Sequence, residues 1–403
     1  MKKIVHIAGM DSYEGHESGN YIVFKTFRKL PYESIHIFGC AKHWGDPDTF
    51  FVPLTSTASQ VGLEDRFDAA DVVIIYDTLL EPETLRKIYD KHKCDIVWVG
   101  MVHDFFTGGC SYPTECSRFQ DSCGSCPQLI GDKFASHTGN ENKPPSSDEK
   151  DQTYQLMQRK LNLLKDIPIY GVGVSNYSVD LMRTSSLLKD KHCECIPIPF
   201  DIPTSPLSRD EAKQQLNLPT DKFNILWGTT QPHMPRKGRK YVDESMNYLY
   251  NLMKEKNINT DTVLFTTVGP MPNPPFSETQ PFNWKHIGYA PTREILSSVY
   301  KSANVGLQTT IEDAGPMMSV ECLSNQTPLV SFDRCVSADI IENGKNGFLV
   351  DTYDSKSFGK SIFKVYESDV DMGINADFYV KRFNNEEQTM KKWQTLIERI
   401  TSQ

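Results

Sequence analysis

Two carboxylates eight residues apart mark the part of the sequence best suited to ligand chemistry. Asp313 and Glu321 flank Gly315 and Pro316 in the stretch TTIEDAGPMMSVECLSN. Proline favours the first position of a helix, so a helix is predicted to begin here. Along a helical path the two acids would lie within about 12 Å of each other. This arrangement suits a ligand with hydroxyl groups at both ends and a diphosphate between them, because carboxylates accept from hydroxyls and a helix N-terminus favours an anion.

A pair of cations precedes these acids in the sequence. Arg236 and Lys237 stand before Gly238 in PHMPRKGRKYVDES, after a predicted strand. Fixed cations in such a position can neutralise a developing phosphate charge without a metal ion. An Arg-Lys-Gly run is also typical of a solvated surface, and two acids at this spacing are also typical of surface charges. Only the combination favours an anion-binding site.

A second stretch, HDFFTGGCSYPTECSRFQDSCGSCPQL, combines a histidine and an aspartate with four cysteines. His103 and Asp104 at a predicted strand end are candidates for acid-base work, although a histidine satisfied by backbone is the plainer interpretation. The cysteines follow the spacing C-x5-C-x6-C-x2-C and are Cys110, Cys116, Cys123 and Cys126. The tight last pair is typical of a zinc knuckle, and a four-thiolate site would be structural because it leaves no open position. Free thiols, disulfides and an iron-sulfur cluster are the alternatives.

The elements that must position these residues alternate between strands and helices. Short apolar runs such as KKIVHIAG, DVVIIYD and CDIVWVG predict parallel strands buried on both faces, and segments such as PETLRKIYDKHK predict the helices between them. The second half repeats the rhythm with FNILWGTT, TVLFTTVG, WKHIGY, ANVGLQTT, TPLVSFD and GFLVD. The predicted fold class is therefore α/β, with two Rossmann-like doubly wound domains facing each other across a cleft.

A proline-rich stretch divides the chain. IPIPFDIPTSPLSRDEAKQQLNLPTDK has the composition of an interdomain connection followed by a short helix. We predict an N-terminal domain over 1–200, which includes the four-cysteine loop 104–129, a linker over 201–220, and a C-terminal domain over 221–403 whose last helix returns towards the N-terminal domain. Gly15 lies in a glycine-bearing turn after the first strand, but the turn lacks G-x-G-x-x-G, so a dinucleotide oxidoreductase is not supported.

Composition excludes other classes of function. The chain has 403 residues and a net charge of -9, whereas a nucleic-acid binder normally carries a basic excess, so nucleic acid is not an expected partner. An apolar stretch of 18 residues is missing and the N-terminal apolar run is too short for a secretory signal, so we expect a cytoplasmic protein. One basic-aromatic stretch, FKTFRKL, leaves a peripheral contact with the inner membrane face open.

Taken together, these motifs resemble a known family. The chain resembles the family 4 retaining glycosyltransferases of the GT-B fold, a group-1-type family, over most of its length. The resemblance rests on EGHESGN, HDFFTGGCSYPTECSRFQDSCGSCPQL, IPIPFD, RKG, HIGYAPTREILSSVYKSANVGLQTTIEDAGPMMSVECL and DIIENGKNGFLVD. It implies that the N-terminal domain holds the acceptor and that the C-terminal domain binds a nucleotide sugar.

The resemblance also implies roles for individual residues. Glu321 would bind ribose hydroxyls, and Lys237 with Arg236 would hold the diphosphate. Asp313 would contact the sugar where the family usually has glutamate, with Glu312 as a competing candidate. The remaining donor contacts would be Gly15 in the N-terminal glycine loop, Gly288 and Tyr289 against the base, and the backbone of Gly315, Pro316, Met317 and Met318 at the sugar. His103, helped by Asp104, would orient the acceptor hydroxyl.

The implied reaction moves a sugar from a nucleoside-diphosphate sugar to an acceptor hydroxyl with retention of anomeric configuration. The leaving phosphate, held by Lys237, would help to deprotonate a glycan or lipid-linked acceptor in polysaccharide or glycoconjugate biosynthesis. Catalysis would need no cofactor, and zinc at the cysteines would be structural. The alternative is a non-catalytic, zinc-stabilised protein that binds nucleotide sugars or glycans on the same scaffold.

Overall fold

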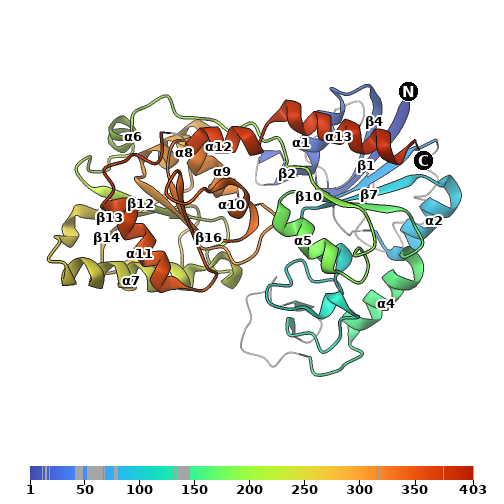
Figure 1. Cartoon of the computed structure of the whole chain (residues 1–403), viewed down its shortest axis with the longest axis horizontal. Coiled ribbons are helices and arrows are strands. Elements are labelled where there is room, and N and C mark those ends of the chain that lie inside the picture. The colour runs from blue at the N-terminus through green and yellow to red at the C-terminus, as the bar shows by residue number, and fades with distance from the viewer. Residues whose placement is uncertain are drawn as a thin grey trace. The chain divides into compact units, whose positions relative to one another are not determined.

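The protein folds as two units, each with its own sheet and its own core (Figure 1). The structure is a computed structural model, which describes residues 1–10, 12–13, 16–17, 19–40, 49–51, 67, 69–76, 80–130, 133–134, 146–315, 317–374 and 376–402. Unit 1 contains Met1–Ala135, Asn140–Phe200 and Asn384–Gln403, and unit 2 contains Asp201–Phe383. Within the described residues, none of the helices is both long and apolar enough to span a membrane.

Unit 1 is built on a seven-stranded parallel sheet with the strand order β11-β10-β7-β6-β1-β4-β5. Its strands are β1 (Lys2–Met10), β4 (Tyr32–Cys40), β5 (Thr49–Phe51), β6 (Val72–Ile75), β7 (Asp95–Gly100), β10 (Ile169–Gly173) and β11 (Cys193–Cys195). Two short antiparallel hairpins lie outside the sheet, β2 (Ser12–Tyr13) with β3 (His16–Glu17) and β8 (Leu129–Ile130) with β9 (Lys133–Phe134). The central strand β6 is buried along its whole length, as its apolar run VVII predicts.

Two helices of unit 1, α4 and α5, begin at polar residues whose side chains cap them. Asp151 accepts hydrogen bonds from the backbone of Thr153 and Tyr154 at the start of α4, and Ser175 caps α5 in the same way. The helices are α1 (Gly19–Phe27), α2 (Pro82–His92), α4 (Gln152–Leu164), α5 (Asn176–Thr184) and α13 (Glu386–Ile400), with short 3-10 turns η3 (Asp104–Phe106) and η4 (Arg118–Gln120).

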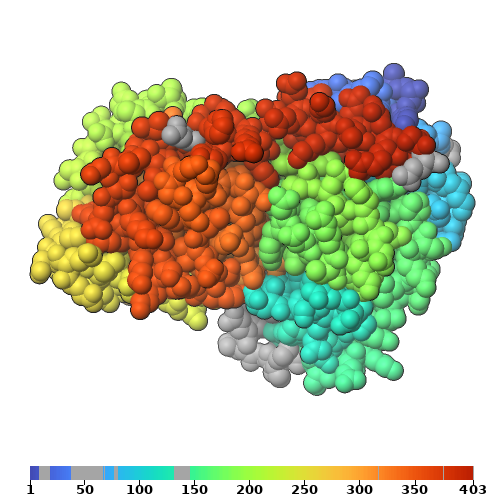
Figure 2. Space-filling model, viewed as in Figure 1, coloured from blue at the N-terminus to red at the C-terminus, as the bar shows by residue number. Residues whose placement is uncertain are grey.

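The C-terminal helix α13 packs on the N-terminal part of unit 1. The rings of Trp393 and Phe27 meet edge to face with centroids 5.1 Å apart, and Lys29 forms an ion pair with Glu386. Figure 2 shows this segment, in dark red, on the surface beside the blue surface of the N-terminal residues. The last residues of the chain therefore complete the core of the first unit.

Unit 2 contains a six-stranded parallel sheet with the order β14-β13-β12-β15-β16-β17. The strands are β12 (Phe223–Gly228), β13 (Val263–Val268), β14 (Asn283–Gly288), β15 (Val305–Gln308), β16 (Leu329–Phe332) and β17 (Gly347–Val350). The helices are α6 (Arg209–Gln215), α7 (Arg239–Glu255), α8 (Arg293–Ser302), α9 (Met317–Ser324), α10 (Cys335–Ile340), α11 (Ser355–Tyr366) and α12 (Ala376–Phe383), with 3-10 turns η5 (Pro235–Lys237), η6 (Thr260–Thr262) and η7 (Phe276–Glu278).

Both faces of this second sheet are covered by apolar side chains. Ile225 and Trp227 of β12 pack into a core with residues of α7 and α11, whereas Leu226 between them packs with residues of α8, α9 and α12. Successive strand residues point to opposite faces, so one continuously apolar strand can supply two cores. Unit 2 is therefore doubly wound, as the sequence predicts.

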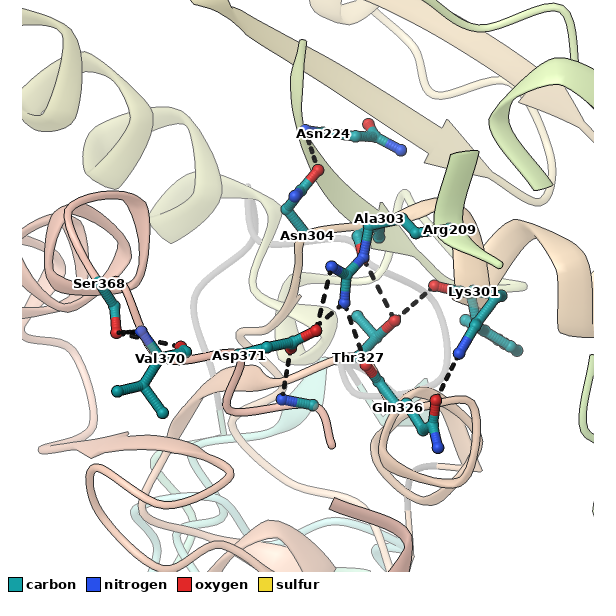
Figure 3. Close-up of polar contacts among 12 residues, drawn as sticks. Arg209, Asn224, Lys301, Ala303, Asn304, Gln326, Thr327, Ser368, Val370 and Asp371 are labelled. Atoms are coloured by element: carbon teal, nitrogen blue, oxygen red, sulfur yellow. Dashed lines mark hydrogen bonds and ion pairs between the residues drawn. The ribbon is translucent and has the colours of Figure 1, made fainter. Parts of the chain in front are cut away.

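The stretch expected to link the two halves folds onto unit 2. Residues 201–220 contain α6, whose Ser208 cap forms a capping box with Glu211. Arg209 Nε donates to the carbonyl of Ala303 over 3.0 Å, and its guanidinium also reaches the Asp371 carboxylate at 3.4 Å (Figure 3). These contacts hold the stretch on unit 2, where α6 packs beside α8.

Candidate functional site

The loops that follow β12 and β15 carry the cations and one of the acids predicted to bind a ligand. β12 and β15 are neighbouring parallel strands, so their carboxyl ends meet at one edge of the sheet. The two loops are joined by backbone contacts: Ile311 N–H donates to Arg236 O over 2.7 Å, and Thr309 Oγ1 donates to Lys237 O over 3.2 Å. Arg236 and Lys237 are thereby held beside Asp313.

Gly238 makes the close approach of these loops possible. Its φ of +75° lies in the left-handed region, and a Cβ built on it would sit 1.9 Å from the carbonyl oxygen of Thr309. A residue other than glycine would therefore push the two loops apart at the position where α7 begins.

Asp313 is the shared partner of both cations. Its Oδ2 lies 2.5 Å from Lys237 Nζ and 3.1 Å from Arg236 Nη1. Arg236 also donates to the backbone oxygen of Glu312 at 3.2 Å and to Gln231 Oε1 at 2.9 Å. Burial by itself would raise the pKa of Asp313, but the charges and hydrogen bonds of Lys237 and Arg236 outweigh it and lower that pKa to about 2. The carboxylate is therefore ionised throughout the physiological range.

The second predicted acid, Glu321, has a different environment on α9. Its Oε2 accepts a hydrogen bond of 2.7 Å from the hydroxyl of Tyr300, a buried residue of α8. Burial raises the pKa of Glu321, and the Tyr300 hydrogen bond only partly opposes this. One acid is thus paired with cations and the other with a neutral phenol. Nothing in the sequence pointed to Tyr300, because the two residues lie on different helices with no motif that relates them.

Four of the other predicted donor contacts, Gly288, Tyr289, Met317 and Met318, lie in the same unit. Gly288 ends β14 with a φ of +84°, and the next residue, Tyr289, is 53% exposed. Met317 begins α9, Met318 is buried within it, and Gly315 precedes it. Gly15 and Pro316 lie outside the residues that the structure describes. Their assigned roles stay predictions.

His103 and Asp104 lie in unit 1, at the start of the turn η3. His103 is fully buried, with its Nε2 3.3 Å from Ser178 Oγ and its backbone N–H bonded to Ser111 O over 3.0 Å. This environment fits the plainer interpretation of a histidine held by its surroundings, and the acceptor-orienting role stays a prediction. Buried Lys160 donates to the backbone oxygens of Asp104 and Thr107, at 2.5 and 2.9 Å, and burial lowers its pKa to about 8.

The four cysteines of the loop 104–129 gather in one region of unit 1 as free thiols. Cys110 lies within electrostatic range of Cys116, Cys123 and Cys126, and Gly108 N–H donates to Cys123 Sγ over 3.2 Å. Burial raises the pKa of Cys110 well above its usual value and raises that of Cys123 to about 12. In the described part of the chain, no three His, Cys, Asp or Glu side chains form a group that could hold a metal ion. The thiols are close together, but they do not form a metal site as they stand.

Comparison with known proteins finds a family model that matches part of unit 2. Residues 280–378, which include Asp313, Glu321 and Tyr300, match the family model described as glycosyl transferases group 1. By contrast, no curated protein sequence matches the chain.

Solved structures resemble the chain over its whole length. Sucrose-phosphate synthase from Thermosynechococcus elongatus has a TM-score of 0.65 at 13% identity, with 100% of both chains covered. Anabaena HepE in complex with UDP and glucose has a TM-score of 0.65 at 12% identity, also with 100% of both chains covered. The pneumococcal O-GlcNAc transferase GtfA in complex with UDP and GlcNAc has a TM-score of 0.61 at 10% identity, with 99% of both chains covered.

At these identities the likeness establishes the fold. The predicted fold is confirmed: the chain has the GT-B fold with two Rossmann-like units, and its residues 280–378 match the model of the group 1 glycosyl transferases.

Proposed function

We propose that this protein is a glycosyltransferase that moves a sugar from a nucleoside-diphosphate sugar to an acceptor hydroxyl with retention of anomeric configuration. The observation that carries the proposal is the cluster of Arg236, Lys237 and Asp313 at the carboxyl ends of β12 and β15. Two fixed cations at this edge of a doubly wound sheet are the donors that a diphosphate requires. The group 1 match over 280–378 supports the same assignment for unit 2.

The roles follow from the chemistry of each side chain. Arg236 and Lys237 bind the diphosphate, and Glu321 accepts hydrogen bonds from the ribose hydroxyls. HepE and GtfA were both solved with UDP, which makes UDP the first nucleotide to test here. We propose a glycan or lipid-linked acceptor, a place in polysaccharide or glycoconjugate biosynthesis, and a cytoplasmic location.

The proposed reaction keeps the incoming and outgoing oxygens on one face of the sugar. The bond between the anomeric carbon and the diphosphate oxygen breaks, and the bond to the acceptor oxygen forms on the same side. The acceptor proton passes to the leaving phosphate, whose developing charge Lys237 stabilises. No step of this scheme requires a metal ion or a covalent enzyme intermediate.

The test is donor turnover by the purified full chain. UDP-sugars are incubated with the protein, first without acceptor and then with a panel of sugar acceptors, and released UDP is measured. Turnover that is lost in Lys237→Gln supports the proposal, and the anomeric configuration of the product, read by NMR, decides between retention and inversion. Tight binding of UDP-sugars with no release of UDP under any condition would instead identify a non-catalytic binding protein.

A further inference from the structure

The ion-pair cluster of unit 2 joins its three charged side chains to one another. Lys237 and Arg236 both direct a donor at the same oxygen, Oδ2 of Asp313. The side chains of Arg236, Lys237 and Asp313 are only 8%, 13% and 18% exposed. Charged groups are rarely buried to this extent unless they are paired, so the carboxylate explains how two neighbouring cations can be held here.

We infer that Asp313 is a built-in counter-ion that competes with the diphosphate for Lys237 and Arg236. This inference rests on the proposed function and deepens it, because it gives Asp313 a role other than contact with the donor sugar. The N–H groups that would bind phosphate oxygens are the same ones that now bind Oδ2. A diphosphate must therefore displace Asp313 from one or both cations, and Asp313 can pair with them again when the nucleoside diphosphate leaves.

The surroundings of Asp313 favour such an exchange. Its own backbone N–H is held by Cys335 Sγ at 3.2 Å, and Arg236 keeps a bond to Gln231 that does not involve Asp313. The backbone bond between Ile311 and Arg236 joins the two loops independently of the ion pairs. The carboxylate can thus give up its cations while the loops stay in place.

The inference predicts an unusual direction of effect. Asp313→Asn keeps the shape of the side chain and removes its charge, so the carboxylate that Lys237 and Arg236 share no longer attracts them. Inorganic pyrophosphate should then bind to Asp313→Asn about 10- to 100-fold more tightly than to the wild type, since a hydrogen bond to a charged group contributes about 1.5 to 3 kcal/mol. Its affinity should also fall more steeply with added salt. Asp369→Asn, at an exposed site of the same unit, is the matched control and should change neither property.

Pyrophosphate titration by calorimetry on the full chain is the test, with Asp313→Glu as a second variant that keeps the charge and should bind no more tightly than the wild type. Unchanged or weaker binding to Asp313→Asn overturns the inference and returns Asp313 to a positioning or sugar-contact role. The double variant Lys237→Gln with Asp313→Asn should lose most of the gain in pyrophosphate affinity, because that gain depends on the Lys237 cation.

A measurement on the wild type covers the case in which Asp313→Asn does not fold. With 13C-labelled aspartate carboxyls, the signal that is missing from Asp313→Glu should shift when pyrophosphate is added, and a signal that stays in place overturns the inference. Pyrophosphate binding requires no sugar transfer. A protein that behaves as predicted here and yet never turns over a nucleotide sugar would refute the proposed function alone.

Discussion

Replacing Tyr300 with phenylalanine should weaken nucleotide binding through a residue that touches no ligand in our proposal. The Tyr300 hydroxyl donates to Glu321 Oε2 over 2.7 Å, and the tyrosine is only 5% exposed. Phenylalanine keeps the ring and its packing, so the change removes only the hydrogen bond. Because the acceptor is charged, the loss should cost about 1.5 to 3 kcal/mol, part of it in stability and part in the orientation of the carboxylate.

The pH dependence makes this prediction specific. Burial already raises the pKa of Glu321, and the Tyr300 hydrogen bond opposes that rise. Without the hydroxyl the pKa must rise further, so the carboxyl takes up its proton at a higher pH than in the wild type. A protonated carboxyl accepts more weakly from ribose hydroxyls. As the pH is lowered, UDP affinity should therefore begin to fall earlier in Tyr300→Phe than in the wild type.

The assay is calorimetric titration with UDP at a series of pH values from neutral downwards. At neutral pH the affinity of Tyr300→Phe for UDP should be lower than that of the wild type by up to about 100-fold. Tyr366→Phe is the matched control, because the Tyr366 hydroxyl bonds over 3.0 Å to a neutral partner, Thr262 Oγ1, in the same unit. The control should leave both affinity and pH profile unchanged. An identical pH midpoint in Tyr300→Phe and the wild type would refute the reasoning.

Three further predictions concern other parts of the protein. His6 is fully buried and burial lowers its pKa well below 6.5, so the free energy of unfolding should fall as the pH drops below 6.5, and His6→Asn should flatten that decline in thermal unfolding. Gly238→Ala should lower the melting temperature more than Gly344→Ala, because both glycines have positive φ but only Gly238 would bring a Cβ against backbone, and equal losses would contradict the clash. The zinc expected from the cysteine spacing stays a prediction: elemental analysis of protein purified without added metal should find one zinc per chain, which requires the four thiols to move into a closed site, and its absence would leave Cys110 and Cys123 as thiols whose pKa burial raises.

Local pattern was enough to predict the sheets, because strands buried on both faces read as continuous apolar runs. The run VVII forms β6, and FNILWG forms β12. Strands without that signal were not predicted: β10 carries two glycines in IYGVG, and β11 is only CEC at the edge of its sheet. The packing of the last helix on unit 1 depends on a contact between Trp393 and Phe27 that residue spacing cannot reveal.

The candidate site was predicted in its residues but not in its pairings. Arg236, Lys237 and Asp313 were each singled out, yet the bond between them joins positions 76 or 77 residues apart, so it depends on β12 and β15 becoming neighbours. The same is true of Tyr300 and Glu321 on separate helices. Residue type indicates which interactions a side chain can make, whereas the fold determines which partner it contacts.

The two acids of unit 2 show that the groups around a carboxyl determine its pKa. Asp313 faces two cations, which hold its pKa at about 2, whereas Glu321 faces burial and a neutral phenol, which leave its pKa above the usual value. At moderately acid pH one carboxyl therefore stays charged while the other begins to take up a proton. If Asp313 acts on the diphosphate and Glu321 binds the ribose, mild acidification should weaken the binding of UDP more than the binding of pyrophosphate. The ratio of the two affinities then isolates Glu321, because the ionisation of the diphosphate itself affects both ligands.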